Sequence, residues 1–232
     1  MSDRPEISVI IPAYNAAAFV GDAIRSVLDQ QERVELIVVD DGSTDDTAGE
    51  VARFGDAVHL VSAPRNEGLP SALNRGLASA TGELIGFLDA DDVWQPGRLG
   101  MELNLLSGAE ADALWGITCV RFLEEDGSWR SSQEWPPKQF PSIGAMLFRR
   151  RVFDRLGGFD ASLQHAPDID FLARFAEAGL TFLRHEEVVL TWRRHTRNMT
   201  NDIGVDRDYF ATAVRRALAR RRAVSPSSST GT

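Results

Sequence analysis

The sequence is poor in cysteine, in net positive charge and in long apolar runs, and each shortage excludes a class of protein. Cys119 is the single cysteine among 232 residues, so an internal disulfide and a thiolate zinc site are excluded. The formal net charge of −9 argues against a nucleic-acid partner, because phosphate binding needs a basic surface. The first apolar run, ISVIIP, is too short for a signal peptide or a membrane span. We therefore expect a cytoplasmic protein whose one thiol lies in the core.

The residues that are present are sufficient for a folded domain. The chain is 43% hydrophobic and 25% charged, so a core can form without disulfides or a structural metal. Its charge is uneven, because six arginines and one acid lie between Arg207 and the end, which gives +5 there and leaves −14 for residues 1–206. A surplus of carboxylates forms a solvated surface or, beside apolar strands, can hold a divalent cation.

Short β-branched runs alternate with helical patterns through the first 95 residues. The predicted strands cover residues 7–11, 36–39, 58–61 and 84–88, and all four are expected to be buried. The predicted helices cover residues 17–30, 43–54 and 69–80. Ser43, with Asp46 three residues later, predicts a capping box for the second helix. The alternation predicts βαβ units, a mostly parallel sheet and helices on both of its faces.

The second half of the chain is less regular. Its predicted elements are a helix at 96–106, strands at 114–123 and after the turn at Asp126-Gly127, a loop at 131–141, helices at 151–156 and 168–179, and a strand at 187–192. Together with the first half they predict a single α/β domain over residues 1–206. A basic helix is expected at 207–223 and a disordered tail at 224–232. The helix either lies on an anionic membrane, as a peripheral contact, or packs on the acidic body with its arginines facing outward.

Polar segments follow the four predicted strands of the first half. They are Pro12-Ala13-Tyr14-Asn15, Asp40-Asp41-Gly42-Ser43, Ala63-Pro64-Arg65-Asn66 and Asp89-Ala90-Asp91-Asp92. Because ligands bind beyond the carboxyl ends of parallel strands, we expect these segments to line one crevice. Asp89 and Asp91 can share Mg²⁺ or Mn²⁺ on a diphosphate, or can form an acidic turn that caps the next helix. Asp40-Asp41 can likewise be a ligand site or a polar turn.

Four segments in this order resemble the signature of family 2 glycosyltransferases. They are SVIIPAYN at 8–15, VDDGSTDDT at 39–47, NEGLPSALNRGLASATGELIGFLDADD at 66–92 and GAMLFRRRVFDRLGGFD at 144–160. The likeness covers about residues 7–200. It implies the GT-A fold, a Rossmann-like, mostly parallel sheet, with a nucleotide-sugar half at 1–95 and an irregular acceptor half at 96–206. It also implies a nucleotide-diphosphate sugar donor, with UDP-sugars favoured, a divalent Mn²⁺ or Mg²⁺, and inversion at the anomeric carbon during transfer to a sugar, lipid-linked or peptide acceptor.

The same resemblance implies roles for individual residues. The nucleotide-sugar contacts that it implies are Pro12, Tyr14, Asn15, Asp40, Asp41, Arg65, Asp89, Ala90 and Arg194. Among these, Asp41 faces the base, Asp89 the ribose or donor sugar, and Arg194 the departing diphosphate. Asp91 is the implied metal ligand, and neutral His195 is either a further ligand or a structural residue. Inverting transfer also needs a general base for the acceptor hydroxyl.

The implied base is Asp168. Family members commonly carry Glu-Asp-x-Asp at a helix start, whereas this chain has Pro167-Asp168-Ile169-Asp170, so proline replaces the glutamate. Pro167 suits a helix entry. Alternatively, Asp168 and Asp170 only stabilise the start of that helix through its dipole.

Several further interpretations stay open. One of Trp115, Trp129 and Trp135 can stack on an acceptor sugar, or all three can be core or loop anchors. FLDADDV also resembles the motif of haloacid-dehalogenase phosphatases, but that class needs a downstream lysine, and Lys138 is the only lysine. A degenerate, non-catalytic nucleotide-sugar-binding module is the other alternative. A methyltransferase is disfavoured because no glycine-rich loop follows the first strand.

Overall fold

The computed structural model describes residues 7–124, 126–163 and 167–198, together with residues 212, 215, 216, 219 and 220. Its centre is a mixed nine-stranded sheet with the order β3-β2-β1-β4-β8-β6-β9-β5, and β7 pairs with β6 outside this path. The strands are β1 (Ile7–Ala13), β2 (Val34–Asp40), β3 (His59–Ser62), β4 (Leu84–Phe87), β5 (Val93–Trp94), β6 (Ala113–Leu123), β7 (Trp129–Ser131), β8 (Met146–Arg149) and β9 (Phe182–Arg194).

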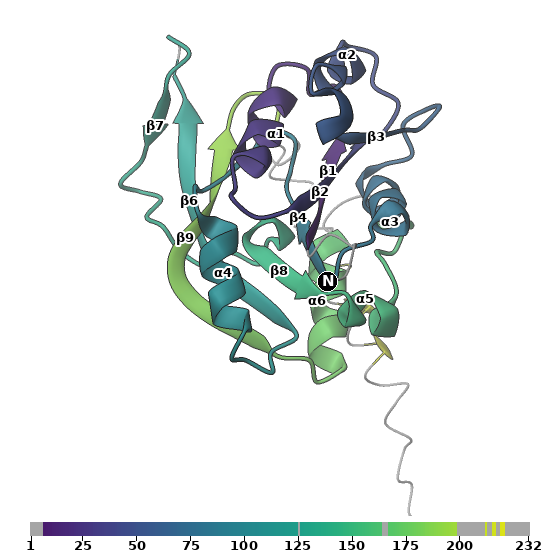
Figure 1. The fold of residues 1–232 in the computed structure, drawn as a ribbon, viewed down its shortest axis with the longest axis vertical. Helices are drawn as coiled ribbons and strands as arrows, with labels where there is room; N and C mark the ends of the chain where they lie inside the picture. The colour runs from purple at the N-terminus through teal and green to yellow at the C-terminus, as the bar shows by residue number, and fades with distance from the viewer. Residues whose placement is uncertain are drawn as a thin grey trace, which may run out of the picture.

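Helices cover both faces of the sheet (Figure 1). They are α1 (Val20–Leu28), α2 (Thr47–Ala52), α3 (Leu69–Ser79), α4 (Arg98–Leu106), α5 (Arg151–Leu156) and α6 (Pro167–Glu177), with 3₁₀ turns η1 (Gly55–Ala57) and η2 (Ile143–Ala145). The apolar side chains of α1 and α4 pack on one face, and those of α3, α5 and α6 pack on the other. The predicted α/β architecture is therefore confirmed, including the cover on both faces.

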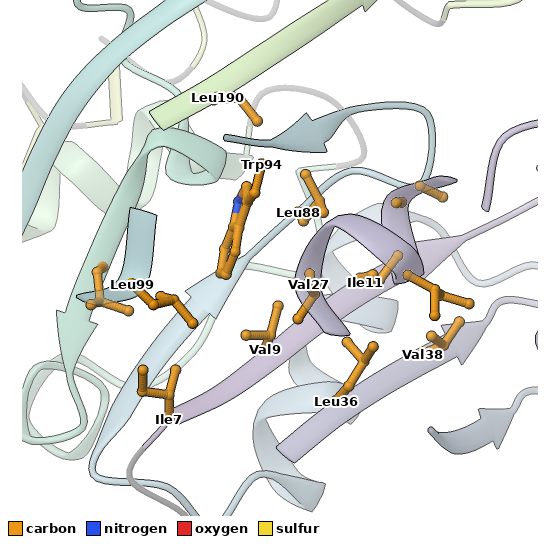
Figure 2. Close-up of a cluster of buried hydrophobic side chains, with 14 of the residues drawn as sticks. Ile7, Val9, Ile11, Val27, Leu36, Val38, Leu88, Trp94, Leu99 and Leu190 are labelled. Carbon is orange, nitrogen blue, oxygen red and sulfur yellow. The ribbon is translucent and has the colours of Figure 1, made fainter. Parts of the chain in front are cut away.

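Alternation along the strands explains the two cores. Ile7, Val9 and Ile11 of β1 belong to the core that includes α1 and α4, and Figure 2 shows Val9 and Ile11 beside Val27 of α1, whereas Ile10 belongs to the core on the α3 side. Each of these four side chains is fully buried, and burial of such a side chain contributes roughly 1.5–3 kcal/mol. β1 pairs in parallel with both β2 and β4, so its carboxyl end lies beside theirs. This packing places the polar segments after these three strands at one edge of the sheet.

Some expectations for the elements are wrong. The strand predicted at 58–61 is not buried, because β3 is an edge strand whose His59 and Ser62 are exposed. The capping box at Ser43 does not form: α2 begins at Thr47, and the Ser43 hydroxyl instead accepts a hydrogen bond from the Asn15 N–H at 2.9 Å. Cys119 is half-buried rather than in the core, with its Sγ 3.1 Å from the Thr191 Oγ1. The short strands β5 and β8 were not predicted, because antiparallel pairing of four residues or fewer leaves little periodic signal.

Two described arginines of the predicted basic helix contact the acidic body. Arg216 pairs with Asp160, and Arg220 pairs with both Asp170 and Glu177, at 2.8 and 2.9 Å. The expectation that the arginines face outward is therefore wrong for these two, since they neutralise carboxylates of the domain. The rest of 207–223, and the tail at 224–232, lie outside the described residues. Within the part of the chain that is described, no helix is long and apolar enough to cross a membrane.

Candidate active site

A cavity of about 610 Å³ opens where β1, β2 and β4 end. Segments from both halves of the sequence line it: the loops after these strands, the start of α3, and the chain that follows β9. Its lining residues are Pro12, Ala13, Tyr14, Asn15, Ala16, Phe19, Asp41, Asn66, Gly68, Leu69, Ala72, Asp89, Ala90, Asp91, Trp192, His195, Arg197 and Asn198. The crevice expected beyond the strand ends is thus present.

Asn15 organises the wall between β1 and α2. It adopts a left-handed backbone conformation, with φ of 50°, which asparagine tolerates better than most residues. Its side-chain oxygen accepts hydrogen bonds from the Thr44 N–H at 2.8 Å and the Asp45 N–H at 3.3 Å. Tyr14 beside it is 48% exposed, although tyrosine usually buries most of its ring. An open ring at a cavity wall is suited to stacking on a planar ligand.

Asp40 and Asp41, at the end of β2, have different roles. The Asp41 carboxylate is buried and accepts hydrogen bonds from the backbone N–H groups of Glu67 and Gly68, at 3.1 and 2.7 Å. Asp40 is also buried, and its Oδ1 accepts a hydrogen bond from the Ser43 N–H at 3.0 Å. Asp40 therefore forms the polar turn, which was one of the two alternatives for this pair. Only Asp41 lines the cavity. Arg65 is exposed and does not line it, whereas Asn66 next to it does.

Three carboxylates approach one another at the end of β4. Enclosure in the cavity, together with the negative charges of Asp91 and Asp168, raises the pKa of Asp89 to about 7. Because the Asp89 side chain remains open to cavity water, we attribute this shift mainly to the two charges. Asp168 contributes to this charge although it is far from Asp89 in the sequence. Asp168 occupies the first turn of α6, which begins at Pro167 as predicted.

The chain after β9 folds over Asp91. His195 Nε2 lies 3.2 Å from Asp91 Oδ2, and the Asn198 side-chain amide donates to the same oxygen at 2.9 Å. The imidazole stacks on Phe19, with ring centroids 4.2 Å apart. His195 Nδ1 accepts a hydrogen bond from the Arg197 N–H at 3.1 Å, which places the proton of a neutral ring on Nε2. In this arrangement His195 donates to Asp91.

Asp91 fits a divalent cation better than His195 does. Its carboxylate faces the cavity and is 28% exposed, so an oxygen ligand is available there. His195 can ligate only after its proton moves to Nδ1 and the Arg197 contact opens. Among the described residues, no group of three or more His, Cys, Asp and Glu side chains is arranged to hold a metal. A cation here would therefore take most of its remaining ligands from a bound diphosphate and from water.

Arg193 was missed by the sequence reasoning, which selected Arg194. Arg193 is buried, and its guanidinium donates to the Asp91 carbonyl and to Asp22 Oδ2, the latter at 2.9 Å. Its backbone N–H donates to Asp92 at 2.8 Å, and burial together with Asp91 and Asp89 raises the pKa of Asp92. Arg193 therefore fixes the loop that carries Asp91. Arg194 stacks on Trp192 at 4.9 Å and does not line the cavity. Neighbouring residues of β9 face opposite sides of the sheet, and the pairing of β9 with β6 determines that Arg193, rather than Arg194, faces the Asp91 loop.

These features agree with the comparisons to known proteins. The model of glycosyl transferase family 2 matches residues 8–165. The chain belongs to this family. The succinoglycan biosynthesis protein ExoU of Rhizobium meliloti is 43% identical to it over 207 residues, which cover 76% of this chain and 58% of ExoU. The chain spans about two thirds or less of the length of such curated relatives.

Solved family 2 structures share the fold at low identity. S. aureus TarS in complex with UDP-GlcNAc superposes with a TM-score of 0.75 at 19% identity, over 92% of this chain and 66% of TarS. The mannosyltransferase PcManGT of Pyrobaculum calidifontis, in complex with GDP-Man and Mn²⁺, gives a TM-score of 0.71 at 23% identity, over 96% of this chain and 65% of PcManGT. The fold of this chain is therefore the GT-A fold that the sequence resemblance implied.

Proposed function

We propose that this chain is an inverting glycosyltransferase that uses a nucleotide-diphosphate sugar and a divalent metal. The observation that carries the proposal is the convergence of Asp41, Asp89 and Asp91 on one cavity, with the Asp168 charge acting on Asp89. Two structural neighbours support the proposal, because TarS was solved with UDP-GlcNAc and PcManGT with GDP-Man and Mn²⁺. We keep a UDP-sugar as the favoured donor. The role is in polysaccharide or glycoconjugate biosynthesis, in line with the name of ExoU, and in the cytoplasm, where a lone thiol stays reduced.

In this proposal the nucleoside binds between the loops after β1 and β2. Tyr14 offers an open ring to the base, and Asp41 offers a carboxylate already fixed by two backbone N–H groups. A carboxylate held in this way can accept from a base N–H without losing rotamer freedom on binding. Asn15 holds the adjacent turn, and Pro12 and Ala90 line the wall. Asp89 would face the ribose or the donor sugar.

The metal would be held by Asp91. When bound, it would neutralise the charge that develops on the departing diphosphate. Arg193 fixes the backbone of Asp91, and Asn198 orients the Asp91 carboxylate by donating to Oδ2. The chain itself thus sets the position of the ligand before any donor binds, which lowers the cost of ordering the site.

Transfer itself requires a base on the side of the sugar opposite the diphosphate. We assign this role to Asp168, which lies in the first turn of α6 and whose negative charge contributes to the raised pKa of Asp89. The acceptor oxygen would form a bond to the anomeric carbon while the bond from that carbon to the diphosphate breaks. The hydroxyl proton would pass to the Asp168 carboxylate. Asp170 is unsuited to this, since it is buried and paired with Arg174 and Arg220.

A thermal-shift screen tests the donor site. Purified protein would be heated with UDP-, GDP- and dTDP-sugars, each with Mn²⁺, with Mg²⁺ or with neither. A ligand at about 100 times its dissociation constant stabilises the folded state by roughly 2.7 kcal/mol, which moves the melting temperature measurably. We expect a metal-dependent shift for one nucleotide series. Absence of any shift would overturn the proposal and favour a non-catalytic or phosphatase function.

Matched variants locate the metal. Asp91→Asn keeps the shape of the side chain and removes its charge, so the shift that depends on metal should disappear. Asp29→Asn removes the same charge at the exposed end of α1, away from the cavity, and should leave the shift unchanged. An Asp91→Asn protein that kept the full metal-dependent shift would exclude Asp91 as the ligand.

A further inference from the structure

An aromatic cluster adjoins the cavity on the acceptor half and has no assigned role. We define it as Trp135, Phe140 and Trp192. The Trp135 and Phe140 rings are stacked with centroids 6.3 Å apart, and Trp192 meets them edge-on at 6.5 and 5.8 Å. Trp192 lines the cavity, while Trp135 is 39% exposed. The cluster therefore extends from the donor cavity toward solvent.

The cluster is linked by side-chain contacts to α6, the helix that carries Asp168. Trp115 donates from Nε1 to the Phe140 carbonyl at 2.9 Å, and its ring packs on Phe182 at 5.5 Å. Phe182 in turn stacks on Phe175 of α6 at 4.2 Å. The cluster is therefore connected through these contacts to α6, whose first turn carries Asp168. An acceptor that presents a hydroxyl to Asp168 would lie along these rings.

Two cationic side chains lie over the rings of the cluster. Lys138 Nζ lies 4.5 Å from the Phe140 centroid and 5.4 Å from that of Trp135, and the Arg194 guanidinium lies 4.9 Å from that of Trp192. Lys138 is exposed, and its backbone exchanges two hydrogen bonds with Thr118 of β6, at 3.0 and 3.1 Å. Among the described residues, no carboxylate forms an ion pair with Lys138. The only lysine in an acidic chain is thus held in place with its ammonium donors available.

We propose that the acceptor is a sugar with an anionic substituent, bound by this cluster. The rings would stack on the sugar face, and Lys138, with Arg194, would pair with a carboxylate or phosphate next to it. A neutral sugar would gain the stacking but would leave the lysine without an anion. This inference rests on the proposed function, since it names the acceptor class for the same site.

Binding of three small probes tests the inference. Methyl β-glucuronide carries a carboxylate, glucose 6-phosphate carries a phosphate, and methyl β-glucoside is neutral. Their dissociation constants would be measured by NMR titration on the full chain, with UDP or GDP and the diamagnetic Mg²⁺ present. One surface ion pair contributes up to about 1 kcal/mol, so we expect at least one charged probe to bind about fivefold more tightly than the glucoside. The charged probe that binds more tightly than the glucoside identifies the substituent as a carboxylate or a phosphate.

Variants separate the roles of the ring and the charge. Lys138→Gln should remove most of the preference for the charged probe and leave glucoside binding unchanged, whereas Trp135→Ala should weaken all three probes. Arg53→Gln, at an exposed arginine beyond α2, is the charge control and should change nothing. Equal binding of charged and neutral probes, or a preference that survives Lys138→Gln, would overturn the inference. The donor thermal shift does not involve Lys138, so its presence shows whether only the acceptor assignment has failed.

Discussion

The two halves of this domain place their functional groups by different means. In residues 7–95, Asn15, Asp41 and Asp89 each follow a parallel strand, so the sheet alone brings them to one edge. In residues 96–198, Asp168, His195 and Trp192 come from a helix start, a loop and a strand. Aromatic packing holds Trp192, and stacking on Phe19 together with a hydrogen bond to Asp91 holds His195. The first half is a regular scaffold for a donor. The second half is an assembly of specific contacts, suited to a variable acceptor.

The largest effect should follow from removing the proposed base, which would show that the second half performs the proton transfer. Asp168→Asn should reduce transfer by about 10²–10⁴-fold, because general base catalysis contributes on that order. Nucleotide-sugar binding, measured by calorimetry, should change less than about twofold, since a factor of two is only about 0.4 kcal/mol. Asp154→Asn, at an exposed position of α5, is the control. Full activity of Asp168→Asn would exclude the assignment.

This division also explains what the sequence could predict. In parallel βαβ units, the residues that bind a ligand directly follow the strands. The cavity residues Tyr14, Asp41, Asp89 and Asp91 could therefore be predicted from periodicity and motif alone. Arg193 could not be separated from Arg194, because the face of β9 is set by its pairing with β6 over a register shift. Similarly, the closeness of Asp168 to Asp89 depends on how α6 packs, and no local pattern encodes it.

A buried polar cluster should stabilise the second half strongly. Arg98 and Glu102 of α4 form an ion pair at 2.9 Å with no exposed side-chain surface, and Arg98 also donates to the carbonyls of Gly144 and Met146. Arg98→Met should lower the free energy of unfolding by about 3–5 kcal/mol, because it leaves a buried charge unpaired. Urea denaturation would measure this loss.

The double variant Arg98→Met/Glu102→Leu tests whether the unpaired buried charge causes this loss of stability. It removes both charges, so it should be more stable than Arg98→Met alone. If the double variant were instead as unstable as the sum of both single variants, the ion pair would not be the cause.

In the first half, close apolar packing should stabilise the fold, as the buried ion pair does in the second half. A Cβ at Gly76 of α3 would lie 2.3 Å from Ile10 Cγ2 of β1, a fully buried side chain. Gly76→Ala should therefore destabilise the protein by about 1–3 kcal/mol through overpacking. Gly108→Ala, where a Cβ meets open space, is the matched control and should not destabilise it. Equal thermal unfolding of the two variants would contradict the close packing of α3 on β1.

The smallest effect should come from a carboxylate at the opposite edge of the first half. Partial burial raises the pKa of Glu35, but hydrogen bonds from Ser8 and Thr81 outweigh it, so the net pKa is below 4.5. The stabilisation is therefore present above pH 4.5 and is lost as the pH falls through the folded-state pKa.

Glu35→Gln should cost about 1 kcal/mol at pH 7, and this difference should shrink in acid. Urea titrations at several pH values would show it, with the exposed Glu187→Gln as the control. A difference that stayed constant down to pH 3 would assign the effect to packing rather than to charge.

The stereochemistry of donor hydrolysis tests the central claim most directly. Once the screen has identified an α-linked donor, the slow attack by water can be followed by ¹H NMR without knowing the acceptor. The anomer that forms first is recorded before the released sugar mutarotates. If Asp168 activates the attacking oxygen opposite the diphosphate, the β-anomer should form first, and more slowly in Asp168→Asn. Initial release of the α-anomer would contradict inversion and the role assigned to Asp168.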